Sequence, residues 1–127
     1  MKSVALSAGI GLAMYAMPAS AHHSFAMFDA NQTTTLEGTV KEFQWTNPHA
    51  WIMLTVTKEG EPDRQWAIEM GGPSGLARQG WRPKTLTPGM PVKVTIHPLL
   101  DGSNGGQFID AVQADGTQLG RGAGQAQ

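Results

Sequence analysis

The sequence contains no cysteine among its 127 residues. This absence excludes disulfide bridges, thiolate metal sites and thiol catalysis. The chain also lacks a marked charge of either sign, because 9 Lys and Arg balance 10 Asp and Glu and no basic run is present. Nucleic acid is therefore not an expected partner.

An apolar run of membrane-spanning length is also missing. The uncharged segment Val4–Met17 has 14 residues, whereas a spanning helix needs about 20. Lys2 precedes this segment, Pro18 ends it, and the small side chains of Ala19–Ala21 match a signal peptidase site. We therefore predict that residues 1–21 are a cleaved signal peptide. The alternative, a buried N-terminal helix, does not explain why the apolar residues show no one-sided face.

Cleavage would leave 106 of the 127 residues, beginning at His22. It would also remove Lys2, so that 8 basic residues stand against 10 acidic ones and the net charge becomes −2. A chain of this length forms one domain with a modest core. We expect a periplasmic or secreted monomer or weak oligomer, with no membrane span after cleavage.

What the sequence has in abundance is glycine and proline, with 16 and 8 residues, between short segments of alternating hydrophobicity. This pattern is typical of strands joined by turns. Gly38 is where we expect a bulge or a sharp bend. Ser74 is a candidate N-cap of a short helix, with Gly80 just beyond its end. The strands are expected at 33–45, 50–58, 64–70, 92–98 and 107–115.

Three strands, a short helix and two more strands are the element order of the five-stranded oligonucleotide/oligosaccharide-binding (OB) barrel. The predicted fold is therefore all-β, a small OB-like barrel with one helix between strands three and four. Other antiparallel barrels or sandwiches fit the strand count, but the helix favours this one. The expected layout is an extended arm at 22–32, a barrel at 33–118 and a disordered tail at 119–127.

All four histidines stand at special positions, and they are the candidate metal ligands. His22 and His23 would open the processed chain, His49 follows the first strand, and His97 ends the fourth. A free N-terminal histidine offers its amine and its ring Nδ1 to one ion, and one further imidazole completes a three-nitrogen histidine brace. As the second residue, His23 offers another route, through the amine, a deprotonated amide and its imidazole.

Nitrogen ligands in a tetragonal plane suit Cu(II) better than other common divalent ions, so copper is the expected metal, with zinc or nickel as alternatives. A thioether for Cu(I) is available from several methionines, although methionine in strands often fills the core. The histidines also have ordinary interpretations, as a turn hydrogen-bond partner for His49 and solvated side chains for the others. The methionines considered are Met27, Met53, Met70 and Met90.

Four tryptophans give a second hypothesis. Aromatic side chains on the ligand face of such a barrel can stack on sugars, bases or other small ligands. The alternative is that two or more of them pack under loops or close the barrel end. A non-metal ligand or a periplasmic protein partner is then the expected binding target. The residues concerned are Trp45, Trp51, Trp66 and Trp81.

Signatures of catalysis are thin, and we assign no catalytic residue. The stretch "GGPSGL" is not a nucleophile elbow, since Leu76 stands where glycine is required. It is not a P-loop either, because it lacks the Gly-Lys-Ser/Thr ending. The carboxylates Glu69, Asp101 and Asp110 have no spacing that predicts a catalytic pair. Binding is therefore favoured over turnover.

Four stretches carry a resemblance to a known family: "AHHSFAMFD", "LEGTVKEFQWTNPHAW", "GLARQGW" and "VKVTIHPLLDGSNGGQF". In them the sequence resembles the small exported bacterial proteins of domain-of-unknown-function family 6152, from His22 to about Leu119. The resemblance implies a periplasmic location. It also places the family's recurring histidine motifs on His22, His23, His49 and His97, and it implies no activity.

Overall fold

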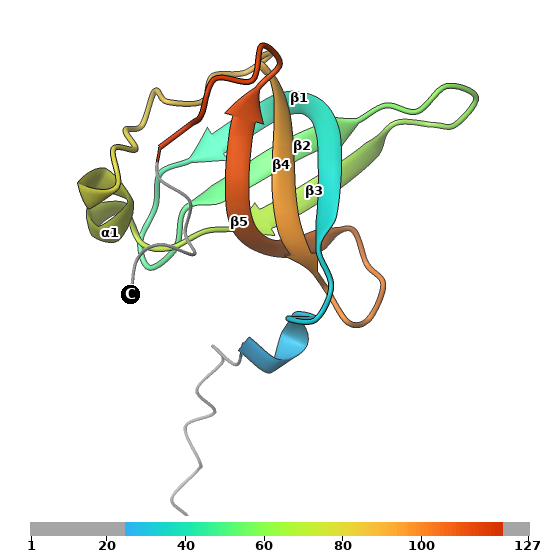
Figure 1. The fold of residues 1–127 in the computed structure, drawn as a ribbon, viewed down its shortest axis with the longest axis horizontal. Coiled ribbons are helices and arrows are strands. Elements are labelled where there is room, and N and C mark those ends of the chain that lie inside the picture. The colour runs from blue at the N-terminus through green and yellow to red at the C-terminus, as the bar shows by residue number, and fades with distance from the viewer. Residues whose placement is uncertain (1–24, 121–127) are drawn as a thin grey trace, which may run out of the picture.

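The protein is a closed five-stranded β-barrel with one short helix, as the computed structural model of residues 25–120 shows (Figure 1). Around the barrel the strands follow the order β1-β2-β3-β5-β4, and β1 closes the ring by pairing with β4. Only β3 and β5 run parallel; the other pairs are antiparallel. The strands are β1 (Thr34–Gln44), β2 (Trp51–Val56), β3 (Arg64–Glu69), β4 (Pro91–Pro98) and β5 (Gly105–Gln113).

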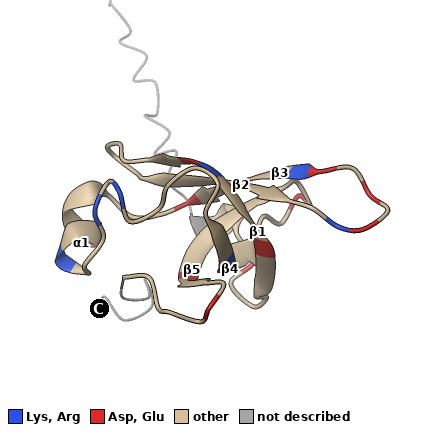
Figure 2. Ribbon diagram, turned by 90° about the horizontal axis from the view of Figure 1, so that it is seen from above, with Lys and Arg blue, Asp and Glu red and all other residues tan. Residues whose placement is uncertain are grey.

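The predicted all-β barrel with a helix between the third and fourth strands is confirmed, because period-2 alternation placed the core side chains correctly. The inward residues Ile52, Leu54, Val94 and Ile96 are completely buried. The outward residues between them are exposed or half-buried. Figure 2 shows acidic and basic positions interspersed over the ribbon, most densely around the loop between β2 and β3.

The long strand β1 belongs to both halves of the barrel. Its first part, Thr34–Thr39, pairs with β4, and its second part, from Thr39 onward, pairs with β2. We expected a bulge or a sharp bend at Gly38, and the bulge of this strand lies between Val40 and Glu42. Gly38 has a different role, because a Cβ there would lie 2.4 Å from the Thr55 carbonyl oxygen. The glycine lets β1 approach β2 closely where it passes from one neighbour to the other.

Substitution of Gly38 by Ala is expected to lower the free energy of unfolding by about 1–3 kcal/mol, the usual cost of overpacking a rigid site. The contacted atom is backbone and cannot rotate away. Urea denaturation followed by circular dichroism measures the change. Gly71→Ala is the matched control, because a Cβ at Gly71 would have nothing within 4 Å. Equal stability of the two variants would contradict the close-approach argument.

The helix α1 spans Pro73–Arg78. With Ser74 as its N-cap it would have begun at residue 75, so it begins two residues earlier than predicted. Gly72 is the N-cap and Pro73 occupies the first helical turn, so the prediction of Ser74 as N-cap is wrong. Proline has no N–H to satisfy at this position and favours helix initiation there. Gly80 follows the C-cap with φ of +91°, as predicted for a glycine just past the helix end.

Two glycines that precede the predicted start of the last strand, residue 107, belong to β5. A Cβ on Gly105 would lie 2.7 Å from Leu99 Cδ1, and one on Gly106 would lie 2.6 Å from the His97 carbonyl oxygen. These glycines therefore pack β5 tightly between β3 and β4. At the other end of the domain, Leu119 is buried and donates its N–H to the Ala111 carbonyl. This corrects the predicted tail at its first residue; positions 121–127 lie outside the described residues.

A short 3-10 helix, η1 (Phe25–Met27), precedes the barrel. Of the helices within residues 25–120, none is long and apolar enough to cross a membrane. The predicted signal peptide and the first three residues of the predicted arm lie outside the part of the chain that the structure describes.

Candidate functional site

The outer surface of the barrel carries one row of half-buried side chains across β2, β3, β5 and β4. Trp51 pairs with Glu69, while Gln107 pairs with both Glu69 and His97. Their chain neighbours Ile52, Ile68, Gly106 and Ile96 are buried, so the row itself faces outward. We call Trp51, Glu69, Gln107 and His97 the outer row. Since neighbouring strands lie about 4.8 Å apart, the Cα atoms of Glu69 and His97 are separated by about 10 Å.

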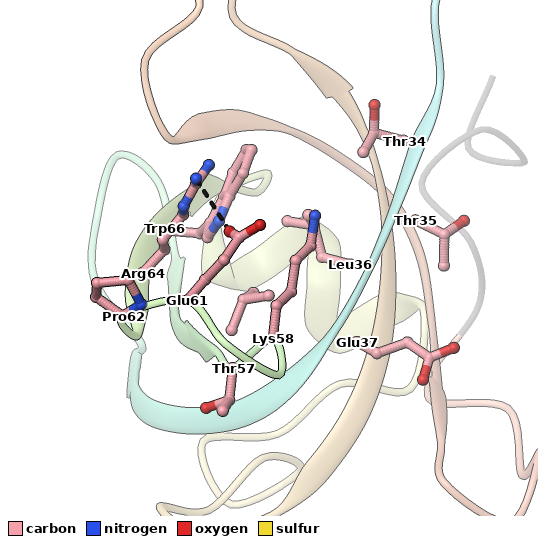
Figure 3. Close-up of a pocket in the computed structure, with 11 residues that line it drawn as sticks. Thr34, Thr35, Leu36, Glu37, Thr57, Lys58, Glu61, Pro62, Arg64 and Trp66 are labelled. Atoms are coloured by element: carbon pink, nitrogen blue, oxygen red, sulfur yellow. Dashed lines mark hydrogen bonds and ion pairs between the residues drawn. The ribbon is translucent and has the colours of Figure 1, made fainter.

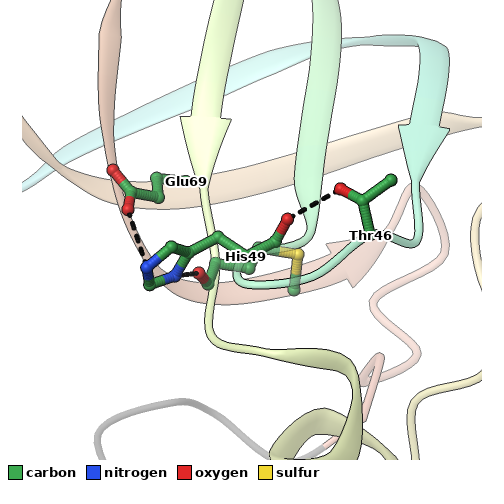
Figure 4. Close-up of polar contacts among 4 residues, drawn as sticks. Thr46, His49 and Glu69 are labelled. Atoms are coloured by element: carbon green, nitrogen blue, oxygen red, sulfur yellow. Dashed lines mark hydrogen bonds and ion pairs between the residues drawn. The ribbon is translucent and has the colours of Figure 1, made fainter.

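His49 reaches one end of the outer row from the loop that joins β1 and β2 (Figure 4). Its ring Nδ1 lies 2.9 Å from the Met70 carbonyl oxygen, and its Nε2 lies 3.5 Å from Glu69 Oε1. The Thr46 hydroxyl donates to the His49 carbonyl at 2.8 Å, and the Ala50 N–H donates to the Gly71 carbonyl. The ring is thus held against the end of β3.

His97 lies at the other end of the outer row and is anchored in the same way. Its Nδ1 is 2.7 Å from the Gln32 carbonyl oxygen. A carbonyl oxygen only accepts, so Nδ1 must carry the proton in both histidines. In a neutral ring the lone pair then resides on Nε2. A hydrogen bond from the second ring nitrogen to a carbonyl is the usual support of a metal-binding histidine.

The N-terminal arm packs beside the His97 end of the row. Phe28 is buried and forms a β-bridge with Leu99, just beyond β4. The Asp29 N–H donates to the Pro98 carbonyl at 2.8 Å, and the Leu100 N–H donates to the Met27 carbonyl at 3.0 Å. His22 and His23 themselves lie outside the described residues. Three residues extend at most about 10 Å, which is the reach of His22 from Phe25.

The donor atoms at the His49 end fit a metal ion in part. Two ligands about 2.0–2.1 Å from one tetrahedral ion lie about 3.3 Å apart, close to the 3.5 Å between His49 Nε2 and Glu69 Oε1. Within residues 25–120, however, no three His, Asp or Glu side chains form a group that could hold an ion. The described residues therefore do not join His49 and His97 into one site. An ion bound at either histidine would need ligands from outside residues 25–120.

One more charge lies on the loop between β4 and β5, close to the arm. The hydroxyl and backbone N–H of Ser103 hydrogen-bond to Asp101 Oδ1 at 2.6 and 2.9 Å. These hydrogen bonds hold the pKa of Asp101 below its usual range. The carboxylate stays ionised at neutral pH, so the loop presents a fixed negative charge.

The sequence profile of one protein family, described as a family of unknown function (DUF6152), matches residues 9–108. The chain belongs to this family. The predicted family resemblance is thereby confirmed, and all four histidines of this DUF6152 protein lie inside the matched region. No curated protein and no solved structure matches the chain.

The four tryptophans of the DUF6152 chain do not share one face. Trp81 is completely buried, with its ring centroid 5.5 Å from that of Phe108, so it is unavailable to a ligand. Trp45 and Trp66 are half-buried and pack against the core. Only Trp51 belongs to the outer row. The physical reason is register. Trp66 pairs with the inward residue Leu54, whereas Trp51 is three residues before Leu54 on the same strand and therefore faces the opposite side of the sheet.

The methionines divide in the same way. Met70 is buried, and Met90 packs against the core, as expected for residues that fill gaps. Met27 is exposed on the arm, and Met53 is half-buried. Of these thioethers, Met27 is the one nearest in sequence to the predicted N-terminal ligands.

Glu69 is the site residue that sequence reasoning missed. It appeared as a scattered carboxylate, although a signal was available in the β2–β3 hairpin. In an antiparallel hairpin the register follows from the turn. The observed register places Glu69 opposite Trp51, and Trp51 is the second residue after His49. Counting outward from a turn at residues 59–63 would have placed Glu69 on the outward face but opposite Met53, two positions from Trp51, because the observed pairing begins at Val56 and Arg64.

Proposed function

We propose that this protein is an exported transition-metal-binding protein that carries or buffers copper. The ion would be held by the processed N-terminal His22 together with one or more of His23, His49 and His97. The observation that carries the proposal is the anchoring of both described histidines, whose Nδ1 atoms lie 2.9 and 2.7 Å from backbone carbonyl oxygens. This anchoring directs the lone pair of each neutral ring to Nε2, the atom that a metal binds.

The chemistry of the donor set favours copper. An amine with a pKa of about 8 and an imidazole with a pKa of about 6.5 both have deprotonated forms near neutral pH. Amine and imidazole nitrogens around one ion suit the tetragonal preference of Cu(II). Zinc and nickel remain alternatives, and Glu69, as an oxygen ligand beside His49, would suit zinc.

The docked arm lies against the end of β4, so the proposal pairs His22 first with His97. The backbone bonds at Asp29 and Leu100 fix the arm to the end of β4, where His97 lies. The proposal requires that the three residues before Phe25, which extend at most about 10 Å, bring the amine of His22 back to this end of the outer row. His49 and Glu69 lie on the far side of Gln107 from His97. They would take part only if the bound ion, or a second one, were held on that side of the outer row.

Export is part of the proposal. The predicted signal peptide, residues 1–21, is what would expose the amine of His22, and it places the protein in the periplasm or outside the cell. A periplasmic protein that delivers or receives the ion is the partner this role requires. The chain would act as a monomer or weak oligomer.

The proposal predicts that the protein trimmed to His22 binds one equivalent of Cu(II) more tightly than Zn(II) or Ni(II). Native mass spectrometry of material exported and processed in the periplasm measures the stoichiometry and the order of the ions. His97→Asn should weaken Cu(II) binding about 10- to 100-fold or more, since even loss of a residue that supports a ligand costs this much. Gln113→Asn, on β5 outside the outer row, is the control. Protein that stays free of Cu(II) at one equivalent would refute the proposal.

A further inference from the structure

A cavity of about 410 Å³ lies between the first residues of β1 and the β2–β3 hairpin (Figure 3). This volume falls within the range of small-molecule sites. The cavity shares no residue with the outer row, so it is separate from the histidines. Its walls come from two elements distant in sequence, residues 34–37 on one side and residues 56–66 on the other.

The floor of the cavity is apolar. Leu36 and Val56 are each 6% exposed and belong to the core. Trp66 is half-buried and packs against that core. Its indole Nε1 is buried and has no hydrogen-bond partner within residues 25–120. A buried donor without an acceptor is unfavourable, whereas a ligand oxygen or water that reached it would remove this cost.

The charges around the cavity leave one cation without an ion pair. Glu61, the carboxylate that Figure 3 shows beside Trp66, is paired with Arg64 at 3.1 Å. Glu37 points away from the hairpin in the same view and is paired with Lys93 at 3.0 Å. Lys58 projects into the space between the hairpin and β1 and forms no ion pair with any residue of the described chain.

We propose that this cavity binds a small organic carboxylate with an aromatic or other apolar body. The body would cover Leu36, Val56 and the Trp66 ring, and the carboxylate would pair with the Lys58 ammonium. A cationic ligand is disfavoured because it would meet Lys58, and the nearby carboxylate of Glu61 is already neutralised by Arg64. The apolar floor favours an aromatic or aliphatic body over a fully hydroxylated one, because it offers contact area and few hydrogen-bonding groups.

Titration of the ¹⁵N-labelled protein with benzoate tests the proposal. Each of the four tryptophans gives one indole N–H signal in a heteronuclear NMR spectrum, and Trp66→Phe identifies the signal of Trp66. Benzoate should shift the Trp66 signal in a saturable manner and leave that of the fully buried Trp81 unchanged. Benzyl alcohol, which has the same ring without the charge, should bind more weakly.

Lys58→Gln should weaken benzoate binding about three- to five-fold, the effect of losing an exposed ion pair worth up to about 1 kcal/mol. Lys84→Gln is the matched control, because Lys84 is an exposed lysine that does not line the cavity. An unmoved Trp66 signal would overturn the site. Equal binding of benzyl alcohol and benzoate, or an unchanged affinity in Lys58→Gln, would overturn the carboxylate as ligand class.

Discussion

Acetylation of the His22 amine is expected to weaken Cu(II) binding at least about 100-fold relative to the protein with a free His22 amine, because loss of a mere supporting partner already costs up to that factor. Acetylation converts the terminal amine into an amide and leaves no free amine beside the imidazoles. The chelate between the amine and its own imidazole is then lost. The route through His23 is lost as well, since it also begins at the terminal amine. An added glycine would not test this, because His22 would then stand second behind a new free amine.

Competition with a chromophoric chelator gives the two affinities, and electron paramagnetic resonance reports how many nitrogens bind the ion. The matched control is amidation of the C-terminal carboxylate of Gln127, which caps the other terminus. This protein should bind Cu(II) as tightly as the trimmed protein. Equal affinities for the two capped proteins would show that the amine is not a ligand. Binding through His49 and His97 would then have to be considered without it.

Trp81→Ala is expected to lower the free energy of unfolding by about 3–5 kcal/mol, the usual cost of removing a buried tryptophan. The side chain is completely buried, and its ring contacts Phe43 and Phe108 at centroid distances of 6.0 and 5.5 Å. For a domain of about 100 residues the melting temperature should fall by at least about 12 °C.

Thermal and urea unfolding followed by circular dichroism measure this loss. Trp51→Ala is the control, because it removes the same side chain from the half-buried outer row. It should cost about 1 kcal/mol or less. If both variants were equally stable, Trp81 would not contribute the core packing that its burial implies. If Trp51→Ala were the less stable of the two, the outer row would contribute more to folding than its exposure implies.

The barrel could be predicted from local patterns because each strand buries one face. In β4 the alternation of Val94 and Ile96 with polar residues indicates directly which side chains lie inside, whereas in β2 the residue between Ile52 and Leu54 is Met53. The helix could be placed by its glycine stop at Gly80. Its start was misplaced because Ser74 and Pro73 are both start signals, and proline, which lacks an N–H, takes the earlier position.

The candidate site could be predicted only in part. Sequence position identified His49 and His97 as residues at strand ends, but not which atom of each ring would be anchored. Those anchors, Met70 and Gln32, are 21 and 65 residues away along the chain. Glu69 was missed for the same reason, because its contact with His49 depends on the pairing of β2 with β3.

Local patterns were enough to predict the strand count, the order of the elements and the family, because alternation, glycine stops and motifs involve residues that are close along the chain. The folded arrangement was needed to show which tryptophan is core, why Gly105 and Gly106 belong to a strand, and that Lys58 lies beside a cavity. Each of these depends on where two distant segments meet. Such contacts are set by the register in which the strands pair around the closed barrel. That register cannot be derived from any short stretch of residues alone.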